Sequence, residues 1–204
     1  MQHYGVVLLS GGINSTVGLA LMQREGIACT ALSFVYGQRH QRAEIASARR
    51  IADYYHTPHE IVRLRFPHIV ENTPEPKESL RSGLARADLV GRMMLFLTYA
   101  ACYADMLNLD RICCGVDAGT VAERRDCQPA ALSAWTQMIR AVFVDGAELC
   151  LPFVQMAQAE IVHLGNHLAA PLHLTWSCHD PQPGRTSCGV CPGCLKRAAS
   201  YGNP

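Results

Sequence analysis

Short apolar runs alternate with helix-like segments along most of the chain, and this order constrains the fold more than any other feature. The runs occupy residues 6–9, 28–35, 59–66, 111–116 and 148–153, and helices are predicted over residues 14–25, 41–55, 92–107, 129–144 and 158–168. Such alternation favours an α/β fold, a doubly wound parallel sheet with helices on both faces. We therefore predict one α/β domain over residues 1–170 and a small C-terminal element over residues 171–204.

Two stretches depart from this regular pattern. Residues 59–66 alternate apolar and charged side chains, which is typical of a strand at the edge of a sheet. Residues 71–89 are polar and rich in proline, and we expect a mobile loop there.

The charge balance and the hydropathy exclude several classes of protein. Eighteen lysines and arginines face seventeen acidic residues, which gives a net charge of +1 and argues against a nucleic-acid partner. No apolar run approaches the roughly 18 residues of a membrane span, and the first residues do not resemble a signal segment. With 49% apolar residues the chain can bury a sizeable core. We expect a cytoplasmic protein with no membrane partner.

Four of the ten cysteines gather near the end of the sequence, at positions 178, 188, 191 and 194. In a reducing compartment such spacing indicates metal ligands rather than disulfides. Four thiolates suit a tetrahedral structural Zn²⁺, so we predict that Cys178, Cys188, Cys191 and Cys194 bind zinc; an iron–sulfur cluster and two disulfides are the alternatives. The other six cysteines are expected to pack in the core, except Cys127, which lies in a polar stretch.

A glycine-rich turn joins the first apolar run to the first helix. Residues 10–16 read Ser-Gly-Gly-Ile-Asn-Ser-Thr, where glycines let backbone N–H groups face a ligand and the helix N-terminus attracts anions. The turn lacks the Gly-Lys-Ser/Thr of a Walker A loop. Phosphate binding and an ordinary strand-to-helix turn are both compatible with this spacing.

This turn resembles the pyrophosphatase-type loop, Ser-Gly-Gly-x-Asp-Ser-Thr, of ATP-dependent enzymes that activate a carboxylate before adding nitrogen. Residues 31–40, 115–118, 126–127, 159–165 and 174–178 narrow the resemblance to the 7-cyano-7-deazaguanine synthase family of the queuosine pathway. The resemblance implies an adenine nucleotide alpha hydrolase-like sheet with a structural zinc element. It also implies that ATP, ammonia and 7-carboxy-7-deazaguanine react to give the 7-cyano product, with Mg²⁺ assisting.

The resemblance also assigns roles to individual residues. It implies catalytic or magnesium-binding roles for Asn14, Asp117 and Asp126, and a contact between Arg39 and the substrate carboxylate. The resemblance implies that a continuous segment binds the nucleotide: Leu8, Leu9, Ser10, Gly11, Gly12, Ile13, Asn14, Ser15 and Thr16. Substrate binding falls to Tyr36, Gln38, Arg39, Arg92 and Trp176. From the residues alone, Trp176 fits either a stacking platform or a hydrophobic plug under the cysteines.

Four positions depart from the family pattern. Asn14 stands where the loop has aspartate, Met94 where an asparagine precedes the helix, Gln128 where arginine is usual, and Gln158 where lysine is usual. An amide brings no negative charge to Mg²⁺, and a missing cation leaves phosphate charge less neutralised. We expect altered activity.

Three functions therefore remain open from the sequence. The first is the ATP-dependent carbon–nitrogen ligase itself. The second is a paralogue that stops at the amide, or that passes the activated acid to an amine on another molecule such as a protein. The third is a catalytically silent module that binds nucleotide or deazaguanine. We also expect a homo-oligomer.

Overall fold

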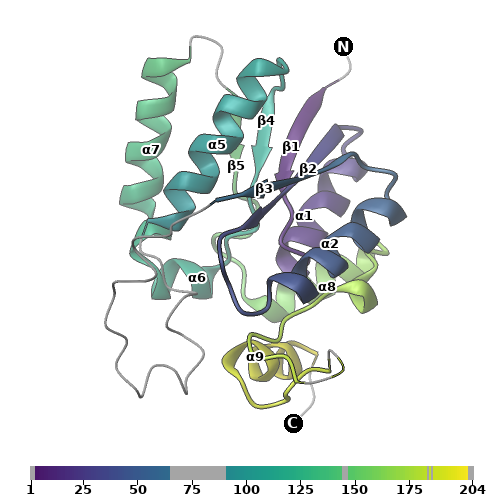
Figure 1. Cartoon of the computed structure of the whole chain (residues 1–204). Helices are drawn as coiled ribbons and strands as arrows, with labels where there is room; N and C mark the ends of the chain where they lie inside the picture. Colours follow the sequence, from purple (N-terminus) through teal and green to yellow (C-terminus); the bar gives the residue numbers. More distant parts are fainter. Residues whose placement is uncertain (1–2, 65–90, 144–146, 183, 185, 202–204) are drawn as a thin grey trace.

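The computed structural model describes residues 3–64, 91–143, 147–182, 184 and 186–201, and a parallel sheet forms their centre (Figure 1). Within these residues five strands pair in the order β3-β2-β1-β4-β5, with every pairing parallel. The strands are β1 (Tyr4–Leu8), β2 (Ala28–Val35), β3 (His59–Arg63), β4 (Arg111–Cys113) and β5 (Glu148–Cys150). β3 lies at one edge, as its alternating sequence predicted.

Helices cover both faces of the sheet (Figure 1). α5 and α7 pack on one face, and α1 and α2 pack on the other, where α8 in turn packs against α1. Two shorter helices, α6 and α9, lie near the carboxyl ends of the strands. The bounds are α1 (Ile13–Arg24), α2 (Gln41–Tyr54), α5 (Arg92–Met106), α6 (Ala118–Glu123), α7 (Pro129–Val142), α8 (Gln158–His167) and α9 (Pro192–Ser200), with 3₁₀ turns η1 (Arg125–Cys127) and η2 (Leu172–Leu174).

The first apolar run shows why this strand must lie inside the sheet. Val6 and Leu8 join the core under α5 and α7, whereas Val7 and Leu9 join the core under α1 and α2. Side chains alternate between the two faces of a strand, so a run that is apolar throughout requires cover on both. All four side chains are less than 10% exposed.

The sheet has a topological switch point at the carboxyl end of β1. The chain moves outward from β1 to β2 and β3 on one side, and β4 and β5 add on the other side. In open parallel sheets, loops diverge at such a point and leave a crevice for ligands. The glycine-rich turn at residues 10–16 leaves β1 there, beside the turn that follows β4.

The predicted α/β architecture and the order of its main elements are confirmed, with differences in detail. β4 and β5 are three residues long, shorter than the apolar runs that predicted them, and the sequence reading missed α6 and α9. The loop predicted at residues 71–89 lies outside the described residues. No helix in the described ranges is long and apolar enough to cross a membrane.

Two expectations about cysteines are wrong. Cys127 is completely buried, because η1 turns it into the core under α5 and α7 although its sequence neighbours are polar. Cys102, predicted to pack in the core, lies on the exposed side of α5.

Candidate functional site

The glycine-rich turn is held in shape by its own hydroxyl groups. The Ser15 and Thr16 hydroxyls both donate to the carbonyl oxygen of Gly12, at 3.1 and 2.8 Å. The Gly12 N–H donates to the hydroxyl of Ser10 at 3.2 Å, and Gly11 adopts a φ of +82° that favours glycine. The turn therefore places the start of α1, whose first N–H groups have no partner within the helix, at the switch point.

The carbonyl oxygen of Gly11 joins three parts of the chain. It accepts a hydrogen bond from the Trp176 N–H at 2.8 Å, and the hydroxyl of Ser47 on α2 lies at the same distance. A Cβ at Gly11 would stand 2.5 Å from the Glu44 carbonyl oxygen, so only glycine permits this approach. Ser47 was not among the predicted site residues; the one signal for it is a small polar side chain on the apolar face of α2.

Two of the four departures from the family pattern meet in the structure. Gln158, the first residue of α8, donates from Nε2 to Asn14 Oδ1 at 2.6 Å. Asn14 in turn donates from Nδ2 to the Gly115 carbonyl oxygen, after β4, at 3.1 Å. Both amides are half-buried. A neutral, hydrogen-bonded pair therefore stands where the family pattern has one acidic and one basic residue.

Asp117 is buried and engaged by two partners. Its Oδ1 accepts from the Thr120 N–H at 2.7 Å, which caps α6, and its Oδ2 pairs with Lys196 of α9 at 2.7 Å. Burial works to raise the pKa of this carboxyl group, but the hydrogen bonds from Lys196 and Thr120 outweigh it and lower the pKa. Asp117 is thus ionised and ties the C-terminal element to the turn after β4.

Asp126 occupies a similar position beside the start of α5. Its Oδ2 accepts from the Met93 N–H at 3.0 Å and from Arg124 Nη2 at 2.6 Å. Burial favours the protonated acid, yet these hydrogen bonds and the nearby charge of Arg92 lower the pKa overall. Sequence reasoning identified Asp126 and Arg92 but missed Arg124.

The predicted substrate residues after β2 lie near the same edge of the sheet, in different environments. Gln38 is 3% exposed; its amide donates to the Phe34 carbonyl oxygen and to Glu44, and accepts from the Tyr36 N–H. Tyr36 is half-buried with its ring under the guanidinium of Arg92, 5.9 Å from the ring centre. Arg39 is exposed and pairs with Asp180 at 2.8 Å. Their roles toward a substrate stay predictions.

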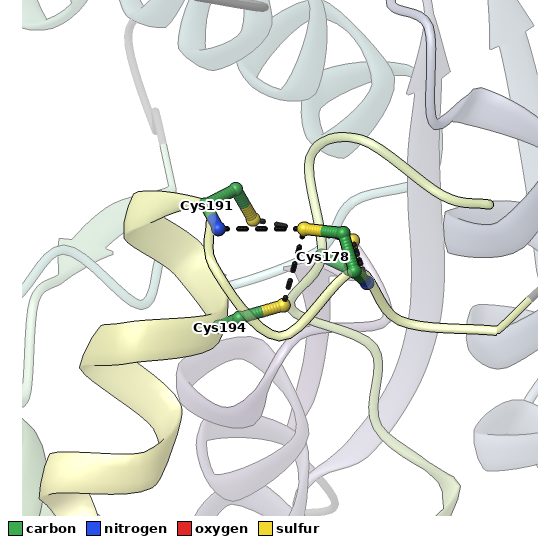
Figure 2. Close-up of side chains that lie close together, drawn as sticks. Cys178, Cys191 and Cys194 are labelled. Atoms are coloured by element: carbon green, nitrogen blue, oxygen red, sulfur yellow. Dashed lines mark hydrogen bonds between the residues drawn. The ribbon is translucent and has the colours of Figure 1, made fainter.

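Four cysteine thiols converge at the start of α9, as Figure 2 shows for three of them. All four sulfur atoms lie within 4.8 Å of one another, and three of the pairs stand 3.6–3.9 Å apart. A disulfide would require about 2 Å. Four sulfurs around one ion at about 2.3 Å stand about 3.8 Å apart, whereas thiolates on different irons of a cluster spread wider. The geometry therefore fits a single tetrahedral metal ion.

Backbone groups around the cysteines favour the thiolate form of Cys191, whereas burial raises the pKa of Cys178 and of Cys194. The N–H groups of His179, Cys188 and Cys191 each donate to a cysteine sulfur at 3.3 Å. Burial works against ionisation of Cys191, but the hydrogen bonds to its sulfur lower its pKa to about 6. Gly193 packs so closely on the Ser177 carbonyl oxygen that any Cβ would clash with it.

The structure brings several of the predicted site residues together. The loop, Asn14, Asp117 and Trp176 surround the switch point, joined through Gly11, Gly115 and Lys196. Trp176 donates from its indole nitrogen to the Cys178 carbonyl oxygen at 2.7 Å, so it also contacts the cysteine cluster. His163 and His167 lie exposed on α8.

Known families and relatives match nearly the whole chain. The model of the family described as "Queuosine biosynthesis protein QueC" matches residues 4–203. Curated proteins named 7-cyano-7-deazaguanine synthase are similar: that of Leptospira interrogans is 34% identical, covering 98% of this chain and 87% of the relative. That of Saccharophagus degradans is 33% identical, with 96% and 92% covered.

Solved structures support the fold. The NMN synthetase from Francisella tularensis superposes with a TM-score of 0.56 at 16% identity, covering 100% of this chain and 78% of that one. A 4-thiouridine synthetase bound to RNA and ATP gives 0.55 at 17% identity, covering 97% and 50%. At these identities the likeness concerns the arrangement of sheet and helices alone.

We predict that a bulky side chain at Gly12 strongly weakens ATP binding and leaves the fold intact. A Cβ there would stand 3.3 Å from Ser10 Oγ, so this hydroxyl must shift by a few tenths of an ångström, and 3.6 Å from the Trp176 carbonyl oxygen, which is an ordinary contact. The added side chain would obstruct the approach of the phosphates to the turn. Losing one charged hydrogen bond costs about 1.5–3 kcal/mol, so Gly12→Leu should weaken ATP binding at least about tenfold in calorimetry. Gly12→Ala is the graded control. Unchanged ATP affinity in Gly12→Leu would contradict a phosphate role for the turn.

Proposed function

The chain belongs to the Queuosine biosynthesis protein QueC family, and from that premise we propose that it is an ATP-dependent carbon–nitrogen ligase making 7-cyano-7-deazaguanine. The observation that carries this proposal is the glycine-rich turn at the switch point of a parallel sheet, within a family match over residues 4–203. The names of the relatives give the product, 7-cyano-7-deazaguanine. The substrates that the resemblance implies are ATP, ammonia and 7-carboxy-7-deazaguanine.

The reaction divides into two activations. A carboxylate oxygen of the substrate attacks the α-phosphorus of ATP, and pyrophosphate leaves; ammonia then attacks the acyl carbon, and AMP leaves to give the amide. The amide oxygen then attacks the α-phosphorus of a second ATP and pyrophosphate leaves; loss of AMP and protons from the adenylated amide gives the nitrile. The N–H groups at the start of α1 stabilise the charge that develops on the departing pyrophosphate.

Magnesium would assist by neutralising phosphate charge. The predicted ligands Asn14, Asp117 and Asp126 each already accept hydrogen bonds from this chain. We therefore propose that the phosphates bring Mg²⁺ with several of its waters, as is usual for this ion, and that these residues hold it less directly than a dedicated cage would.

We propose that zinc fills the four-cysteine site and serves structure rather than chemistry. Four thiolates saturate a tetrahedral ion and leave no open position for a substrate. The C-terminal element that zinc would hold together contacts the glycine-rich turn through Trp176 and contacts Asp117 through Lys196. Zinc would thereby stabilise the site from a distance.

The cytoplasm is the proposed location, because it supplies ATP and keeps thiolates reduced. The predicted homo-oligomer and the absence of a nucleic-acid partner stay predictions.

We predict that the purified protein, with ATP, Mg²⁺, ammonia and the carboxy-deazaguanine, forms the nitrile, detected by mass spectrometry. Omission of ammonia is the control. A product that stops at the amide would assign the paralogue function, since the neutral Asn14–Gln158 pair is the feature that favours weakened activation. ATP binding without any product would assign the binding module and overturn the ligase.

Metal removal should unfold the C-terminal element first. We expect one zinc per chain by metal analysis, and a lower melting temperature after chelation because binding free energy of a structural zinc is folding free energy. Cys194→Ser should reproduce the effect, whereas Cys102→Ser, an exposed cysteine outside the cluster, should not. Iron in reduced, anaerobically purified protein would contradict the assignment.

A double substitution tests the neutral pair. Asn14→Asp alone removes the donor to the Gly115 carbonyl and turns a carboxylate oxygen toward it, which should cost about 1–3 kcal/mol of unfolding free energy. Adding Gln158→Lys places a cation at the 2.6 Å contact and should recover most of that loss.

The double variant should also consume ATP faster than Asn14→Asp alone, because it adds a cation for phosphate to the carboxylate that both variants offer Mg²⁺. Denaturant unfolding and AMP release measure the two effects, with each single substitution completing the cycle. Strictly additive effects would show that the two side chains do not act as a pair.

A further inference from the structure

Two arginines surround one buried carboxylate near the start of α5. Arg124 binds Asp126 through Nη2 at 2.6 Å, with the Arg124 side chain 16% exposed and that of Asp126 6% exposed. Arg92 lies close enough for its charge to lower the pKa of the same carboxyl group. Two positive charges therefore meet one negative charge in a largely buried place.

Each arginine also carries a buried nitrogen that is left without a hydrogen-bond partner in the described part of the chain, although the Arg124 side chain also interacts with the thiol of Cys127, a weak acceptor. Among the residues that the structure describes, Arg92 Nη1 and Arg124 Nε have no hydrogen-bond partner. Buried guanidinium donors without partners are costly, and the surplus of one charge adds to that cost. An anion that accepts from both groups would relieve both penalties.

The surroundings identify the kind of anion. The Arg92 guanidinium lies over the ring of Tyr36, which in turn packs against Phe96, with the two ring centres 5.5 Å apart. A flat heterocycle can stack beside such rings while a carboxylate on its edge meets the guanidinium groups.

We propose that Arg124, together with Arg92, binds the carboxylate of the heterocyclic substrate, an inference that rests on the proposed function. Arg124 then supplies the cation that the family pattern places at position 128, where this chain has an exposed glutamine. Arg124 precedes η1 and Gln128 follows it, so the cation comes from the opposite end of this turn.

The predicted alternative, Arg39, is less suited to this task. Its side chain is 53% exposed and already pairs with Asp180 at 2.8 Å. Charges exposed to water bind an anion weakly, whereas a buried fork of N–H groups binds it strongly and with defined geometry.

The test compares two ligands that differ in charge. Calorimetry measures the affinity of each variant for 7-carboxy-7-deazaguanine and for the neutral 7-cyano product. We expect Arg124→Gln to lose at least tenfold in affinity for the acid and less than twofold for the nitrile. Arg124→Lys, which keeps a cation beside Asp126 and protects the fold, should show a smaller loss in the same direction because it lacks the Nε donor.

Arg125→Gln, at the adjacent exposed arginine, is the matched control and should bind both ligands as the wild type does. The ratio of the two affinities is unaffected by a general loss of stability. An unchanged ratio in both Arg124 variants, or a ratio that falls only in Arg39→Gln, would overturn the inference. Failure of the proposed function is recognised separately, as a wild type that binds the acid but does not convert it.

Discussion

The carbonyl oxygen of Gly11 is the contact on which the site most depends. It accepts a hydrogen bond from the Trp176 N–H and lies 2.8 Å from the Ser47 hydroxyl. The glycine-rich turn, α2 and the segment before the cysteines therefore meet at one atom. Glycine at this position is required, because its φ is positive and α2 leaves no space for a side chain. The loop is thereby held open toward the switch point before any ligand arrives, and a preorganised site loses less entropy on binding.

Charge is distributed differently here from what the family pattern would suggest. The loop and α8 meet through two neutral amides, while cations gather elsewhere: Lys196 on Asp117, and Arg92 and Arg124 around Asp126. Each acidic side chain near the crevice is therefore paired within the protein, and a net positive charge remains near Tyr36. The binding of an anionic substrate, rather than the binding of a metal, is what this arrangement favours.

The sheet, its edge strand and the four-cysteine cluster could be predicted because each depends on local patterns: alternation along β3, apolar residues on both faces of β1, and a fixed cysteine spacing. Arg124 and Lys196 could not, since their meaning comes from a partner brought near by folding. Lys196 and Asp117 are 79 residues apart, and no periodicity links them. The burial of Cys127 could not be predicted for the same reason. Its sequence neighbours are polar, and only the 3₁₀ turn η1 directs its side chain into the core.

The long separations within the site have a consequence for synthesis of the protein. Asn14 and Gln158 lie 144 residues apart, so the phosphate loop leaves the ribosome long before its partner on α8 is made. At about 5–20 residues per second, that interval lasts roughly 7–30 seconds. Until α8 is made, the crevice lacks the wall that this helix provides. Nucleotide therefore meets a complete pocket only after translation has passed α8 and the segment carrying Trp176, which makes ligand binding a late event in the life of the nascent chain.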